Sequence, residues 1–236
     1  MPSIRDVRRF SGRGADEAAT AFISRRILKE LSVQPGDRLV DIGCGDGMLL
    51  RFALDQGAGR AIGVSGSEEE ARCLREWGLD VRQAYTHALT LPDRCASMIV
   101  CNSVLHIVSP AMIPASLQEI ARIAEPAARV WIGEIPRFRE DASLRKFANI
   151  PAMLWWLLVN RGVRSFIGMC RRVLAGKQRE PVLKSAQAFW AEPEEFIGMA
   201  RDAGLVVERH FPHESIDAES RTYVSATRHD YLFRKS

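Results

Sequence analysis

The chain has 236 residues, enough for one α/β domain with a sizeable core and short for two independent domains. Its composition is 47% hydrophobic and 26% charged, the ordinary balance of a soluble protein. The formal charge of +4 gives no reason to expect a nucleic-acid partner, because such proteins carry a clustered basic face. We therefore treat residues 1–236 as a single domain.

The cysteines and the first residues bear on the cellular compartment. The five cysteines are odd in number, and their spacings match neither a zinc site nor a disulfide framework. We therefore expect reduced thiols and a cytoplasmic protein. The N-terminal stretch lacks the apolar core of a signal peptide. The most apolar run, 152–159, has eight residues, whereas crossing a bilayer takes about 20.

Helical and strand patterns alternate through the first half of the chain. Residues 15–31 carry apolar side chains at helical spacing, which predicts an amphipathic helix that ends before the turn at Pro35 and Gly36. The order that follows predicts a parallel sheet covered by helices on both faces. We expect strands at 38–42, 60–64, 80–84, 97–101 and 129–134, and helices at 47–56, 68–77 and 112–124.

The alternation stops after residue 134. Residues 144–175 have a helical, apolar and basic pattern, so we expect 137–190 to be a helical insertion or cap within the domain. A helix at 192–203, with Pro193 in its first turn and Gly204 at its end, precedes two final strands, at 205–211 and 230–234. The expected fold is a doubly wound α/β sheet of seven strands, mostly parallel, with the last strand antiparallel.

A glycine-rich loop follows the first predicted strand. Gly43, Gly45 and Gly47 lack Cβ atoms, so the backbone can turn sharply and a ligand can approach it closely. The next helix begins with free N–H groups and a partial positive charge, which suit a carboxylate or a phosphate. The spacing Gly-x-Gly-x-Gly departs from the dinucleotide fingerprint, because Met48 stands at the third glycine position. A nicotinamide cofactor is therefore disfavoured.

The sequence VDIGCGDG around this loop resembles the first motif of the class I S-adenosylmethionine-dependent methyltransferases. The similarity continues in order through GVSGSEEE at 63–70, THALTLP at 86–92 and MIVCNSVLHIV at 98–108. The resemblance implies a Rossmann-like fold and S-adenosylmethionine as cofactor, with its amino-acid part held by Asp41 and the loop 43–47. The cofactor-binding candidates are Asp41, Gly43, Cys44, Gly45, Gly47, Ser65, His87 and Asn102.

Three positions lack an acidic residue that the family usually has. Ser65 stands where a carboxylate usually binds both ribose hydroxyls, His87 where one meets the adenine amine, and Met98 replaces an aspartate in the fourth strand. A serine hydroxyl cannot bind a diol as a carboxylate does, so these departures indicate weaker cofactor binding or a member that has lost catalysis. Glu68 or Glu69 could compensate, and Ser65→Asp is expected to tighten cofactor binding.

Two side chains at the ends of predicted strands are the candidate catalytic residues. Methyl transfer is an in-line displacement that needs alignment and, for a hydroxyl acceptor, removal of a proton. His106 lies just beyond the fourth strand as a candidate base, and Glu134 ends the fifth, where it could bind a substrate hydroxyl. Either residue could instead serve packing or loop capping. For His210 and His213 a surface or structural role is favoured. No metal signature is visible, so no metal is expected.

The predicted insertion is strongly basic. Residues 137–179 hold ten Lys and Arg against two acids, a local charge of +8, with Trp155 and Trp156 among them. Three interpretations stay open. The segment could be a lid whose cations meet a phosphate on the acceptor. It could contact an anionic membrane surface through 144–175. It could also be a helical cap or a dimer contact with a solvated basic face.

Shorter patterns bear on the acceptor. NSVLHIV, IGEIP and the terminal RHDYLFRK are similar to methyltransferases of bacterial surface-polysaccharide pathways. The resemblances imply methyl transfer from S-adenosylmethionine to a small-molecule or lipid-linked acceptor, at a hydroxyl, with a sugar-type acceptor favoured. One alternative is a non-catalytic relative that binds S-adenosylmethionine, S-adenosylhomocysteine or a partner protein. A less favoured one is a nicotinamide-dependent oxidoreductase. If the insertion is an anchor, the protein would lie at the inner membrane surface.

Overall fold

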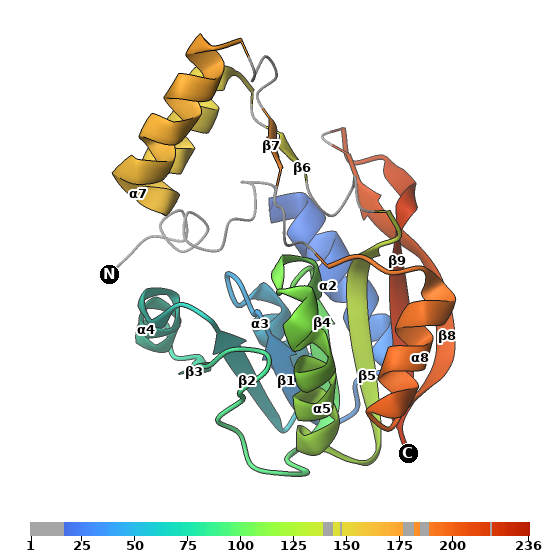
Figure 1. Ribbon diagram of the computed structural model, residues 1–236. Coiled ribbons are helices and arrows are strands. Elements are labelled where there is room, and N and C mark those ends of the chain that lie inside the picture. The colour runs from blue at the N-terminus through green and yellow to red at the C-terminus, as the bar shows by residue number, and fades with distance from the viewer. Residues whose placement is uncertain (1–16, 139–143, 147, 177–181, 185–188, 218) are drawn as a thin grey trace.

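The structure, a computed structural model, describes residues 17–138, 144–146, 148–176, 182–184, 189–217 and 219–236. Strands and helices alternate through its first half, as expected (Figure 1). Its elements are α2 (Glu17–Leu31), β1 (Arg38–Ile42), α3 (Met48–Asp55), β2 (Arg60–Ser65), α4 (Glu68–Glu76), β3 (Asp80–Gln83), β4 (Ala96–Asn102), η1 (Leu105–Ile107), η2 (Pro110–Met112), α5 (Ile113–Ile123) and β5 (Ala124–Pro136).

The second half supplies the insertion and the remaining strands. Its elements are β6 (Leu144–Lys146), α7 (Ile150–Leu174), β7 (Val182–Lys184), α8 (Pro193–Asp202), β8 (Leu205–Ile216) and β9 (Thr222–Lys235). The main sheet has seven strands in the order β3-β2-β1-β4-β5-β9-β8. Only β9 runs antiparallel to its neighbours, so the predicted doubly wound sheet with an antiparallel last strand is confirmed.

Strand side chains alternate between two cores, one on each face of the sheet. In β1, Val40 and Ile42 join the core under α5 and α8, whereas Leu39 joins the core under α2, α3 and α4. In β4, Ile99 joins the first of these cores and Met98 joins the second. This period of two, with apolar residues on both faces, explains why the central strands read as near-continuous hydrophobic runs.

The strand order reverses between β1 and β4. β1 pairs with β2 on one side and with β4 on the other, all parallel, so the connections from these strands diverge at their carboxyl ends. In open α/β sheets a ligand binds in the crevice at such a switch point. The glycine loop after β1 and the residues after β4 therefore lie at the expected binding edge.

The insertion differs from the expectation of a wholly helical segment. Leu144–Lys146 was expected to be helical but forms β6, which pairs antiparallel with β7 in a separate two-stranded sheet. The pairing joins residues about 40 positions apart, Leu144 with Lys184, and local periodicity cannot reveal such a partner. The expected helix start at 15–16 and insertion residues 139–143, 147, 177–181 and 185–188 lie outside the described residues.

Helix α7 lies beyond the carboxyl ends of the sheet strands, joined through the β6–β7 ribbon (Figure 1). It has a small core of its own, in which Met153 and Leu157 are buried. Trp155, Val159 and Val163 are more than half exposed at intervals of four residues. Within the described residues, no helix combines the length and apolarity needed to cross a membrane.

Candidate cofactor and acceptor site

The loop between β1 and α3 needs glycine for two reasons. Gly43, Gly45 and Gly47 have φ angles of 77°, 55° and 73°, in the left-handed region that side chains disfavour. A Cβ on Gly43 would also lie 2.2 Å from Cγ2 of Val104. The N–H of Gly43 donates to the carbonyl of Val64 at 2.8 Å, which fixes the loop against β2. The tight turn is thus built into the fold.

A pocket opens beside this loop, under helix α2. The pocket is small, with room for about one water molecule, so it can receive only one end of a larger ligand. Two of its carboxylates, Asp41 and Asp46, are buried. The lining residues are Ile23, Ser24, Ile27, Asp41, Cys44, Asp46, Leu49 and Asn102.

The pocket chemistry fits the amino-acid part of S-adenosylmethionine. The carboxylates of Asp41 and Asp46 suit an ammonium group. The N-terminus of α3 suits a carboxylate, because its first N–H groups have no partner within the helix. One of these, the N–H of Met48, is bonded to Oδ1 of Asp46 at 3.1 Å. The cofactor carries both an ammonium and a carboxylate at this end.

Ser65 has a carboxylate partner that the sequence analysis did not identify. Its hydroxyl donates to Oε2 of Glu70 at 2.6 Å and accepts from the N–H of Ser67 at 3.0 Å. Glu70 is buried in the first turn of α4, whereas Glu68 and Glu69 are exposed. The carboxylate bonded to Ser65 is therefore Glu70, and compensation by Glu68 or Glu69 in binding the ribose stays a prediction.

His87 and Met98 are the other two positions that lack the acidic residue usual in the family. His87 follows β3 in the chain and stacks on Tyr85, with ring centroids 5.8 Å apart and planes at 10°. Met98 is fully buried in the core below α2, α3 and α4. An apolar residue at position 98 therefore serves packing.

Glu134 lies at the carboxyl end of β5 and accepts three side-chain hydrogen bonds. The donors are Nδ2 of Asn102 at 3.1 Å, Oγ of Ser103 at 3.2 Å and Nη1 of Arg228 at 3.2 Å. Glu134 has a φ angle of 62° and Ser103 one of 59°, so both backbones are strained. Because Asn102 also lines the pocket, this network begins at the pocket wall. The other catalytic candidate, His106, lies half-buried in η1 after β4.

Behind Glu134 lies a buried ion-pair network that the sequence analysis missed. Asp230 is fully buried and accepts from Nη1 of Arg26 at 2.8 Å and from the N–H of Glu134 at 2.9 Å. His213 places Nδ1 3.0 Å from both Asp230 oxygens. Of the two histidines expected in a surface or structural role, His213 is buried within this network, whereas His210 is exposed. In the sequence, this network is indicated only by Asp230, a charged residue within the apolar final strand.

The thiol of Cys101, which is buried in β4, is inert. Burial, and secondly the charge of Asp41, raise the pKa of Cys101 far above its ordinary value. A thiol with a raised pKa holds its proton at neutral pH and is a poor nucleophile. Cys101 is therefore not a candidate nucleophile, although it precedes Asn102 at the end of β4.

Comparisons with known proteins agree with this geometry. Residues 40–132 match the family model described as a methyltransferase domain. An uncharacterized methyltransferase of Schizosaccharomyces pombe is 25% identical over 194 residues, 79% of this chain and 65% of that protein. A ubiquinone biosynthesis O-methyltransferase of Hahella chejuensis is 27% identical over 118 residues, 47% of this chain and 48% of that protein. An S-adenosylmethionine-dependent methyltransferase from Mesorhizobium loti has a similar fold, with a TM-score of 0.61, 19% identity, and coverage of 94% of this chain and 100% of that chain.

Residues 40–132 carry a methyltransferase domain. The chain has the fold of solved S-adenosylmethionine-dependent methyltransferases. The matched segment contains the end of β1, the glycine loop and Asn102, and these line or border the pocket. The chain spans 65% and 48% of the length of the two curated relatives. The match ends within β5, so Asp230 and His213 lie outside it.

Proposed function

We propose that this methyltransferase transfers the methyl group of S-adenosylmethionine to a hydroxyl of a small-molecule or lipid-linked acceptor, with a sugar-type acceptor favoured. The observation that carries the proposal is the polar network that starts at the pocket wall with Asn102 and continues to Glu134. When bound, the cofactor supplies an electrophilic methyl group. Glu134 offers a carboxylate to the hydroxyl of the acceptor, and Asp41, Asp46 and the loop bind the amino-acid end of the cofactor.

The Hahella chejuensis relative is named an O-methyltransferase, which supports a hydroxyl acceptor. The remaining cofactor contacts belong to the proposal as well. Ser65, with Glu70 behind it, faces the ribose, and His87 the adenine. Cys44 borders the pocket at the amino-acid end. His106 remains a candidate base at the rim of the acceptor side.

Residues 137–190 are proposed as a cap whose α7 covers the acceptor. In support, α7 lies beyond the carboxyl ends of the strands, and Arg171 and Arg172 are exposed on it (Figure 1). Cations there suit a phosphate on a nucleotide sugar or a lipid-linked sugar. Contact of α7 with an anionic membrane surface is the competing interpretation, which the exposed Trp155 favours.

Two measurements test the function. Calorimetry should show S-adenosylhomocysteine binding and no NAD binding, and the reverse result would remove the methyltransferase proposal. A screen with methyl-labelled cofactor against 4-nitrophenyl glycosides, nucleotide sugars and polyprenyl-phosphate sugars should show labelled product. S-adenosylhomocysteine binding without label transfer to any acceptor would favour the non-catalytic relative.

A double variant separates the two interpretations of α7. Arg171→Ala with Arg172→Ala should raise the KM of a phosphate-bearing acceptor and leave cofactor affinity unchanged if α7 is a lid. If α7 is a membrane anchor, the same change should weaken sedimentation with phosphatidylglycerol vesicles, and added salt should mimic it. The double variant of Lys29→Ala in α2 with Arg201→Ala in α8, both exposed and outside the insertion, is the charge-matched control.

A further inference from the structure

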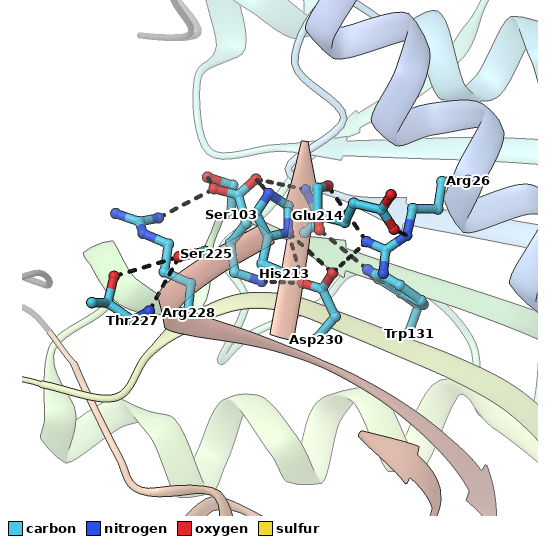
Figure 2. Close-up of polar contacts among 11 residues, drawn as sticks. Arg26, Ser103, Trp131, His213, Glu214, Ser225, Thr227, Arg228 and Asp230 are labelled. Atoms are coloured by element: carbon cyan, nitrogen blue, oxygen red, sulfur yellow. Dashed lines mark hydrogen bonds and ion pairs between the residues drawn. The ribbon is translucent and has the colours of Figure 1, made fainter. Parts of the chain in front are cut away.

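His213 is a buried histidine between two carboxylates (Figure 2). Its Nδ1 lies 3.0 Å from each oxygen of Asp230, and its Nε2 lies 4.0 Å from Oε1 of Glu134. The side chain of His213 is 6% exposed and that of Asp230 is fully buried. Both residues belong to the long C-terminal hairpin of β8 and β9, whose register places position 212 opposite position 229.

The surroundings of Asp230 determine which ring nitrogen of His213 carries a proton. An ionised aspartate only accepts hydrogen bonds, and the other partners of Asp230, Nη1 of Arg26 and the N–H of Glu134, are both donors. Nδ1 must therefore be the protonated nitrogen, which in the neutral ring leaves the lone pair on Nε2. That lone pair lies 4.0 Å from Oε1 of Glu134, a second acceptor, so a hydroxyl beside the two atoms can donate its proton to Nε2.

Nε2 of His213 also lies on the side of the ring where Glu134 leads to the cofactor pocket. Glu134 is bonded to Asn102, and Asn102 lines the cofactor pocket. The three side chains thus lead from the pocket wall to the imidazole at the carboxyl ends of β4 and β5, the ligand-binding edge of the sheet. The strained φ angle of 62° at Glu134 persists in this network, and such strain collects at functional sites.

We propose that His213 is the general base of this methyltransferase, with Asp230 as the residue that positions it; the proposal rests on the proposed hydroxyl acceptor. The hydroxyl proton of the acceptor moves to Nε2 of His213. The oxygen forms a bond to the methyl carbon, and the electron pair of the broken carbon–sulfur bond stays on the sulfur of the departing S-adenosylhomocysteine. The proton on Nε2 then passes to water.

The charges around His213 suit this role. The imidazolium lies between the carboxylates of Asp230 and Glu134, whose other ion-pair partners are Arg26 and Arg228. Its positive charge is thus paired on both sides as it forms. If His213 had only the structural role of donating a hydrogen bond to Asp230, its Nδ1 N–H would be enough, and Nε2 would not need to be basic.

This difference defines the experiment. In His213→Asn the side-chain amide N–H occupies the place of Nδ1 and can still donate to Asp230, while the Nε2 base is removed. His210→Asn, three residues earlier on the same strand and exposed, is the matched control. Each full-length variant is compared with wild type for S-adenosylhomocysteine affinity, thermal midpoint, and kcat and KM with the glycoside that the wild type methylates best.

We expect His213→Asn to fold and to bind S-adenosylhomocysteine like wild type, while kcat falls on the order of 10²–10⁴-fold and the acceptor KM changes little. An unchanged kcat in that variant would overturn the proposal. Wild type that methylates no acceptor would instead remove the proposed function, and the base role with it.

A second readout does not depend on turnover. In wild type labelled with ¹⁵N-histidine and saturated with S-adenosylhomocysteine, long-range proton–nitrogen NMR should show His213 protonated at Nδ1 and bare at Nε2. The resonance is assigned from its loss in the variants. A proton on Nε2 instead would overturn the proposal even if His213→Asn failed to fold.

Discussion

Gly43 has no room for a side chain, and this single position tests the loop geometry. A Cβ there would lie 2.2 Å from Cγ2 of Val104, and the φ angle of 77° is unfavourable for alanine. We expect Gly43→Ala to lower stability by about 1–3 kcal/mol and to abolish S-adenosylhomocysteine binding. Val104→Ala in the same chain removes the clash and should recover part of the stability. Urea denaturation and calorimetry measure both effects, and a fully stable single variant would contradict the geometry.

Ser65→Asp is now expected to act opposite to the sequence-based expectation. The hydroxyl of Ser65 lies 2.6 Å from Oε2 of the buried Glu70, so an added carboxylate would meet a like charge out of water. We expect weaker S-adenosylhomocysteine binding and a lower thermal midpoint. Adding Glu70→Gln should restore both in part, because it removes the repulsion. Tighter binding in the single variant would show that the ribose contact outweighs this repulsion.

At the scale of elements, α5 fixes the loop that carries His87. Arg122 donates from Nη1 to the carbonyl of Leu91 at 2.8 Å and from Nη2 to that of Leu89 at 3.0 Å. It also pairs with Glu119 and Asp93. The side-chain hydrogen bond from Arg122, together with a backbone bond from Leu89, lowers the pKa of Glu119 against the opposing effect of burial. The charged cluster thus holds α5 and the loop that carries His87 together.

Arg122→Ala should therefore destabilise the protein at neutral pH by about 1–3 kcal/mol. A carboxylate with a lowered pKa contributes stability above its unfolded pKa, near 4.3, and loses it as the pH falls through the folded pKa. The deficit of the variant relative to wild type should thus shrink as the pH falls below about 4. Thermal midpoints measured from pH 7 to pH 3 check this. A deficit independent of pH would assign the effect to the carbonyl contacts alone.

At the scale of the whole molecule, Arg26 joins the first described helix to the last strand. It donates to the fully buried Asp230 at 2.8 Å across 204 residues of sequence. Removal of one partner leaves a buried charge unpaired, so Arg26→Met should cost about 3–5 kcal/mol in urea denaturation. The double variant with Asp230→Asn should cost less than the sum of the single changes. Arg25→Met, at the exposed neighbouring position, is the control.

The central sheet could be predicted from sequence because its information is local. Runs such as 38–42 and 97–101 are apolar on both faces, and the glycine loop marks the turn after the first strand. The β6–β7 ribbon and the contacts of His213 could not be predicted, because each depends on partners far along the chain. Glu70 was overlooked for a smaller reason. The rotation of α4 decides which of three consecutive glutamates points inward, and sequence alone does not give that rotation.

The position of β9 has a consequence for synthesis of the chain. β9 is an interior strand, paired with β5 on one side and β8 on the other, although it is the last strand of this sheet to be synthesised. The cofactor loop at 43–47 is synthesised about 185 residues earlier than Asp230. The half of the chain that contains this loop is therefore synthesised long before β9, the strand that completes the sheet. During that interval the edges of β5 and β8 have no partner, and this is when nascent chains of this protein would need a chaperone most.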